Sequence, residues 1–86
     1  MDDDAVLVTS GLSQEIQEGG YIFEINIYRL REEAVWTLEV VDEDGTSHVW
    51  DARFVSDFAA LVEAQKAIRM EGPDAFMAGE GPPTLH

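Results

Sequence analysis

The sequence predicts an α+β fold, a two-layer sandwich in which one C-terminal helix packs on one face of a four-stranded antiparallel meander (ββββα). Two observations lead to this prediction. Residues 14–52 alternate between apolar and polar side chains and are broken by turn residues, as strands with one buried face are. Residues 57–70 instead carry apolar side chains at helical spacing. Since each element has a single apolar face, we expect the sheet and the helix to cover each other.

A hairpin with a tryptophan on each arm is the central predicted feature. On its first arm, residues 34–42, the apolar side chains of Trp36, Leu38 and Val40 recur at every second position. The second arm, residues 46–52, follows the turn signal Asp-Glu-Asp-Gly. Aspartate can accept bonds from the turn backbone and glycine tolerates a positive φ, so the two arms are expected to pair antiparallel.

Two turns fit this hairpin, and they place Trp50 on opposite faces of the sheet. A three-residue loop, residues 43–45, with Gly45 as a left-handed bulge pairs Leu38 with Trp50 and turns both indoles toward the core. A two-residue Asp44-Gly45 turn shifts the register by one and moves Trp50 to the other face. We favour the three-residue loop because it gathers the larger apolar surface on one side.

A second hairpin is predicted upstream, between residues 14–18 and 21–30. The dipeptide Gly-Gly separates the two runs and signals a two-residue primed turn. Such a turn pairs Ile16 with Phe23, which belongs to the apolar set that alternates along its strand. The turn and the alternation therefore agree on which face is buried.

The helix is predicted to begin after Ser56, an N-cap residue, and to end at Gly72, because the following proline cannot continue it. The side chains expected to face the sheet share helical spacing and apolar character. They are Phe58, Leu61, Val62 and Ile68.

The 86 residues are enough for one domain and too few for two. We expect that domain at residues 13–77, after a flexible or partly ordered N-terminal segment at 1–12. A disordered tail, rich in glycine and proline, is expected at 78–86. Within the first segment, residues 5–9 fit either an edge strand or an irregular stretch, and their length does not decide between the two.

Charge is the strongest global feature, because 18 acidic residues against five lysines and arginines give a net charge of −13. Such a surface repels nucleic acid and anionic lipid and favours basic partners, although the charge also serves solubility. No apolar run approaches the ~20 residues that cross a bilayer. We therefore expect a cytoplasmic protein that binds neither nucleic acid nor membrane.

No catalytic, cofactor-binding or metal-binding residue is predicted, and we expect no enzyme activity. The chain has no cysteine and no glycine-rich phosphate loop. The acidic run at 42–45 departs from the spacing of a calcium-binding loop. His48 is expected to be a half-exposed cross-strand residue, and an acid–base pair with Asp51 or Asp57 is the alternative.

The stretch from Trp36 to about Gly72, about half of the chain, resembles a family of short uncharacterised bacterial proteins. The likeness rests on Leu-Glu-Val-Val-Asp-Glu-Asp-Gly-Thr-Ser at 38–47, Val-Trp-Asp at 49–51, a phenylalanine at 54 and Ser-Asp-Phe-Ala-Ala-Leu at 56–61. This resemblance implies a common fold and no particular activity.

The same order of elements also resembles the three-stranded DNA-binding domain of phage-type integrases, where a tryptophan-bearing hairpin leads to a phenylalanine and a helix that begins with serine or threonine. Those domains insert a basic sheet face into the major groove. Here no lysine or arginine occurs between Glu32 and Ala52. The likeness therefore extends to the fold alone, and the negative charge of the hairpin argues against DNA binding.

The function we expect is that of a small acidic, non-enzymatic protein–protein interaction module. The sheet face opposite the helix is more apolar than a face that meets only water, and it is the candidate partner surface. Its residues are Val35, Thr37, Glu39, Val41, Val49 and Asp51, and Ile22 and Tyr28 are further candidates for the same face. The expected partner is an unidentified protein, with a basic one favoured by charge, or a second copy in a homodimer. The alternative function is an acidic nucleic-acid mimic that inhibits a DNA- or RNA-binding protein.

Overall fold

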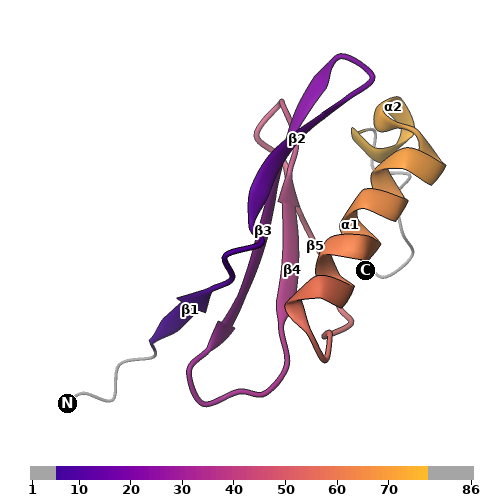
Figure 1. Cartoon of the computed structure of the whole chain (residues 1–86). Helices are drawn as coiled ribbons and strands as arrows, with labels where there is room; N and C mark the ends of the chain where they lie inside the picture. The colour runs from indigo at the N-terminus through magenta and orange to yellow at the C-terminus, as the bar shows by residue number, and fades with distance from the viewer. Residues whose placement is uncertain (1–5, 78–86) are drawn as a thin grey trace.

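The computed structural model describes residues 6–77 and contains one antiparallel sheet with two helices on one of its faces (Figure 1). In chain order the elements are β1 (Leu7–Thr9), β2 (Gln14–Glu18), β3 (Tyr21–Leu30), β4 (Thr37–Val41), β5 (Ser47–Val49), α1 (Asp57–Glu71) and α2 (Pro73–Met77). The predicted α+β fold, an antiparallel sheet with a C-terminal helix, is confirmed. The sheet gains one short strand, β1, and a short helix, α2, follows α1. The tail predicted at 78–86 lies outside the described residues, as do residues 1–5.

The two N-terminal strands share one edge of β3 and are separated by an insertion. Leu7 pairs with Leu30 and Gln14 with Ile25, so seven steps along the edge (14 − 7) match five along β3 (30 − 25). Two extra residues preserve the alternation of faces, so Val8 on β1 and Ile16 on β2 face the same side of the sheet. The hydroxyl of Ser13 fills the gap, because it accepts from the backbone N–H of Ile27 and donates to its carbonyl.

Both predicted hairpin registers are confirmed. Ile16 pairs with Phe23 across the Gly-Gly turn, whose two glycines both have positive φ. In the second hairpin, the Trp50 N–H donates to the Leu38 carbonyl at 3.1 Å. Gly45 closes the three-residue loop with φ 87°. Trp50 is accordingly buried in the core beside the β4 side chains.

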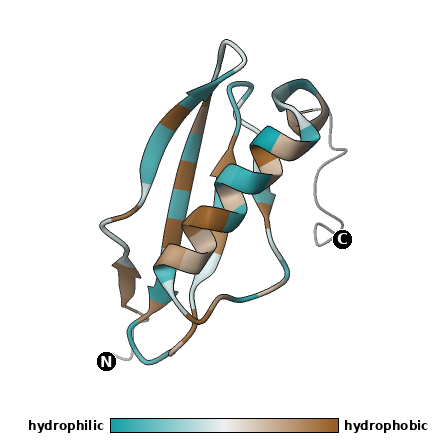
Figure 2. Cartoon of the chain, turned by 45° about the vertical axis from the view of Figure 1, so that its right-hand side comes forward, coloured by the Kyte–Doolittle hydropathy of each residue, from teal (hydrophilic) through white to brown (hydrophobic). Residues whose placement is uncertain are grey.

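The core lies between the sheet and the two helices. Along β3 the apolar and polar residues alternate, which Figure 2 shows as brown and teal bands. The largest fully buried side chains come from two strands, β3 and β4, and from both helices. They are Phe23, Ile25, Ile27, Leu38, Val40, Ile68 and Phe76. Burying each of these contributes about 1.5–3 kcal/mol, which is comparable with the net stability of a small domain.

The predicted buried face of the helix is partly wrong. Leu61 and Ile68 face the sheet, but Phe58 and Val62 are 64% and 43% exposed. Three alanines take the sheet-facing positions beside Leu61 and Ile68 and bring α1 close to the strands. They are Ala60, Ala64 and Ala67. The bulk that the alanines lack is supplied by Trp50 from the hairpin and by Phe76 from α2, whose rings stack with centroids 6.1 Å apart.

Candidate interaction surface

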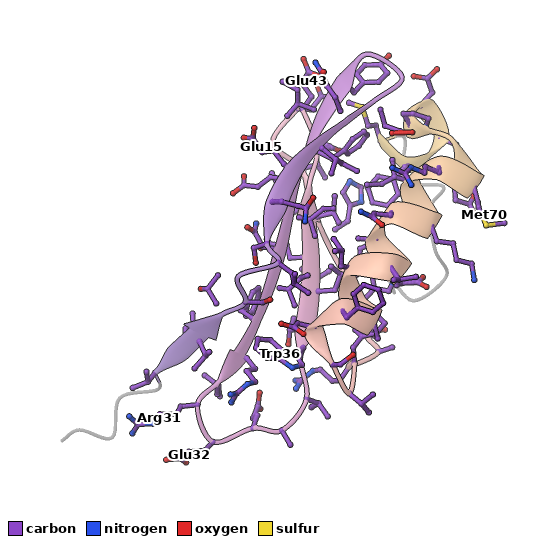
Figure 3. The ribbon with its side chains drawn as sticks, in the orientation of Figure 1. Glu15, Arg31, Glu32, Trp36, Glu43 and Met70 are labelled. Atoms are coloured by element: carbon purple, nitrogen blue, oxygen red, sulfur yellow. The ribbon has the colours of Figure 1, made fainter. Side chains whose placement is uncertain are left out.

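The sheet face opposite α1 is uncovered in the described part of the chain and combines carboxylates with apolar side chains. We call it the open sheet face and define it by six residues. They are Glu15, Ile22, Glu24, Glu39, Val41 and Val49. Pairing across the strands places them side by side: Glu15 lies opposite Glu24, Glu24 opposite Val41, and Glu39 opposite Val49. In Figure 3 the labelled Glu15 lies on the side of the sheet away from α1.

Three of the six residues predicted for the partner surface lie on β4 and face away from the helix. Thr37, Glu39 and Val41 are half-buried and alternate with fully buried neighbours. Val49 lies on β5 beside Glu39. The remaining two, Val35 and Asp51, lie outside the strands, just before β4 and just after β5.

The prediction named Ile22 as a further candidate for this face but left out the carboxylates that β2 and β3 provide there, Glu15 and Glu24. The signal was present in the sequence, because the Gly-Gly turn fixes the register that places Glu15 opposite Glu24. The structure thus extends the predicted surface by two strands. The extension carries two carboxylates, and the side chain of Ile22 is 43% exposed.

Two shallow depressions lie on the extended part of the face. One has a volume of about 240 Å³ and lies between the β3 and β4 strands and the hairpin loop; its lining residues are Glu15, Ile22, Glu24, Val41, Asp42 and Glu43. The other, of about 320 Å³, lies along β2. Ile22 and Glu15 line both depressions. A partner's side chain with an apolar stem and a cationic end could pack its stem against the apolar residues there and pair its charge with a carboxylate.

The negative charge of the open sheet face is not neutralised within residues 6–77. Two ion pairs with arginine occur in that range, Arg53 with Glu33 at 3.6 Å and Arg69 with Glu18 at 3.3 Å. Neither glutamate belongs to the open sheet face. Like charges directly opposite each other in a sheet are destabilising, so the Glu15–Glu24 pair costs the fold some stability.

Two hydrogen bonds hold carboxylates of this region in place. The Ile22 N–H donates to the Glu43 carboxylate at 3.0 Å, where β4 has already ended and offers no backbone partner. The Ser47 hydroxyl donates to the carboxylate of Glu39. These bonds reduce the side-chain freedom that a partner would otherwise have to restrict.

His48 is buried rather than half-exposed, so that expectation is wrong. Its side chain is 5% exposed, and its Nε2 lies 2.9 Å from Oδ2 of Asp42, not near Asp51 or Asp57. The register is the predicted one, with His48 opposite Val40 on the helix side of the sheet, so the difference comes from what covers that face. The ring of Phe76 covers it there, with the two ring centroids 4.5 Å apart.

Asp42 organises the hairpin loop. Its Oδ1 accepts hydrogen bonds from the backbone N–H groups of Asp44 at 2.9 Å and Thr46 at 3.0 Å, while its Oδ2 pairs with His48. Burial alone would raise the pKa of the Asp42 carboxyl, but the bonds from His48 and from the loop backbone outweigh it and lower the pKa. A histidine–aspartate pair can serve acid–base chemistry, yet here both side chains are covered, and we assign the pair a structural role.

Two observations limit the kinds of site that the described residues can form. Within residues 6–77, no three potential metal ligands of the histidine or carboxylate type lie together. No helix in that range is long and apolar enough to cross a membrane. In the comparisons with known proteins, no family model, no curated protein and no solved structure matches the chain. The function therefore has to be inferred from the chemistry of the open sheet face.

Proposed function

We propose that this chain is a small, non-enzymatic interaction module that binds a basic, partly apolar segment of another protein on its open sheet face. One observation carries the proposal: exposed Ile22 and Val49, each 43% exposed, lie among carboxylates that no cation of residues 6–77 neutralises. Apolar contact would supply affinity, and the carboxylates would select a cationic partner and speed its approach. A cytoplasmic location fits the acidic, cysteine-free chain.

Charge also decides which partner this face favours. Two copies packed face to face would bring the carboxylates of both open sheet faces together, and like-charge contacts oppose association. Cationic side chains such as lysine and arginine would instead pair with Glu15, Glu24 and Glu39 while their stems cover apolar surface. The face therefore favours a basic partner over its own symmetric copy.

The nucleic-acid mimic has weaker support. A mimic needs carboxylates concentrated on one face at phosphate-like spacing. Acidic residues here also occur on the helix side, at Glu63, Glu71 and Asp74. The apolar residues of the open sheet face have no counterpart on a phosphate backbone, whereas a protein partner can bury them.

The proposal is tested by titrating the protein with a helical 14-residue peptide of leucine and lysine and following binding by calorimetry. The matched peptide of leucine and glutamate is the control ligand. We expect the basic peptide alone to bind, and Glu24→Lys to weaken its binding about ten-fold or more, the loss of a well-placed ionic contact.

The matched control variant is Glu32→Lys, which changes the net charge equally but lies on the loop between β3 and β4 (Figure 3). Equal weakening by both variants would show that only net charge matters. That result, or equal binding of the acidic and basic peptides, would refute a docking site on the open sheet face.

A further inference from the structure

The outer face of α1 is a second exposed surface that the proposed function does not use. It points away from the sheet, and three of its apolar side chains remain in solvent, as does Val55 just before the helix. Their exposed fractions are 84% for Val55, 64% for Phe58, 43% for Val62 and 74% for Met70. Phe58 and Val62 lie one helical turn apart, and Figure 3 shows Met70 projecting away from the sheet.

This outer face carries the two cations of α1, whereas the open sheet face carries carboxylates. Lys66 and Arg69 lie on it, in the second half of α1, and both are exposed, although Arg69 also forms an exposed ion pair with Glu18 of its own chain at 3.3 Å. The other three cations of the chain, Arg29, Arg31 and Arg53, lie in β3 and in loops outside α1. The outer face of α1 thus offers the combination of apolar and cationic side chains that the open sheet face is proposed to bind.

The geometry points to self-recognition: we propose that the outer face of α1 in one copy docks on the open sheet face of a second copy. This inference rests on the proposed function and names a partner for that surface. A single contact would cover both uncovered faces and would set Lys66 against carboxylates such as Glu24 and Glu39, with Arg69 exchanging its exposed pair with Glu18 for one of them.

Dimensions allow this contact. The 15 residues of α1 span about 22 Å at 1.5 Å per residue. The ten residues of β3 span about 34 Å at ~3.4 Å per residue, so α1 fits within the sheet. The opposite face of the same sheet already packs against α1 of its own copy. The result would be a helix on each sheet face, which is a stable layer arrangement.

The symmetry of the contact determines what kind of assembly forms. The two surfaces lie on opposite sides of the molecule (Figure 1), so each copy can donate its helix to one neighbour and its sheet to another. Such a heterologous contact produces open chains or rings, not a closed two-fold dimer. One helix face is a small interface, and the net charge of −13 opposes assembly, so we expect association only at high protein concentration and with salt to screen long-range repulsion.

Sedimentation equilibrium of the full chain tests the inference with one variant for each surface. The sheet-face variant is Glu24→Lys, and the helix-face variant is Phe58→Gln with Val62→Gln, since glutamine preserves helix propensity. We expect the mass of the natural sequence to rise with concentration, and each variant alone to remain monomeric. An equimolar mixture should form a one-to-one dimer and nothing larger, because one intact helix face then meets one intact sheet face.

Three outcomes would overturn self-recognition. They are a strict monomer at every concentration, a closed dimer that neither variant disrupts, and variants that self-associate as well as the natural sequence.

The Leu/Lys peptide separates failure of self-recognition from failure of the proposed function. If the protein stays monomeric but binds the peptide, the open sheet face serves another basic protein. If the protein neither self-associates nor binds the peptide, the proposed function fails too. Far-UV circular dichroism and Glu32→Lys control for folding and net charge.

Discussion

Glu15 on β2 and Glu24 on β3 lie directly opposite each other on the sheet face that the helices leave open. A pair of like charges in this position costs stability without contributing to the core. Selection for folding alone would not favour such a pair. Its presence beside exposed Ile22 agrees with a surface that gains a cationic neighbour on binding.

Removing this repulsion should stabilise the free protein and weaken its binding. Glu24→Gln is expected to raise the free energy of unfolding by about 0.2–1 kcal/mol, measured by urea denaturation. The same variant should bind the Leu/Lys peptide more weakly than the natural sequence. Glu32→Gln on the β3–β4 loop is the control and should change neither quantity. A loss of stability in Glu24→Gln would show that the glutamate pair is not repulsive.

Phe76 should be the most sensitive residue in the C-terminal helix. It is fully buried and contacts the rings of Phe23, His48 and Trp50. Phe76→Ala should lower the free energy of unfolding by about 3–5 kcal/mol, which is a large share of the stability of a chain this small. The exposed neighbour Asp74→Ala should have a much smaller effect. Similar urea midpoints for the two variants would contradict the placement of α2 over the core.

Gly19 should tolerate substitution less well than Gly20, although both have positive φ. A side chain at either position is strained by about 1–2 kcal/mol. A Cβ on Gly19 would in addition lie 2.7 Å from Cγ of Pro73, whereas one on Gly20 meets open space. Gly19→Ala should therefore be the more destabilising variant in thermal unfolding. Adding Pro73→Ala should recover part of that difference, and no recovery would mean that α2 does not pack on this turn.

The Asp42 carboxylate should make the stability depend on pH. Because hydrogen bonds lower its pKa in the folded state, its contribution is complete above the ordinary carboxyl pKa of about 3.9 and is lost as the pH falls through the folded value. Asp42→Asn should cost about 1.5–3 kcal/mol at pH 7 and progressively less below pH ~4. Urea denaturation across this range checks the result. A difference that stays constant with pH would contradict a charged Asp42 in the folded hairpin.

The outward direction of Phe58 gives a test of the helix orientation. Phe58→Gln should change the free energy of unfolding by less than about 0.5 kcal/mol, as exposed substitutions usually do. Leu61→Ala, on the face toward the sheet, should cost about 2–5 kcal/mol. If Phe58→Gln destabilised the protein as much as Leu61→Ala, α1 would have to be rotated about its axis.

Turn chemistry made the hairpins predictable from the sequence. Gly45 and the Gly-Gly pair each fixed a register, and the alternation along β3 identified the same buried face. β1 could not be decided, because the short run at 5–9 fits a strand or a loop, and the insertion that follows it is bridged by the hydroxyl of Ser13. Such a side-chain bridge leaves no periodic signal.

Long-range packing caused the two errors on the helix side. The spacing of Phe58 and Leu61 does not determine which side of the helix faces the sheet. That orientation depends on the space that Trp50 and Phe76 fill. His48 was misjudged for the same reason, since only the position of α2 buries it. The candidate surface was predicted on β4 and β5, with Ile22 of β3 as a further candidate, but its carboxylates Glu15 and Glu24 were missed, although the Gly-Gly register contained that information.

The most direct test of the open sheet face is a titration of the ¹⁵N-labelled protein with the Leu/Lys peptide, followed by two-dimensional NMR. We expect the amide signals of Ile22, Glu24, Glu39, Val41 and Val49 to shift together and to saturate, while those of α1 remain in place. Shifts confined to α1, or spread evenly over the whole chain, would contradict a binding surface on the open side of the sheet.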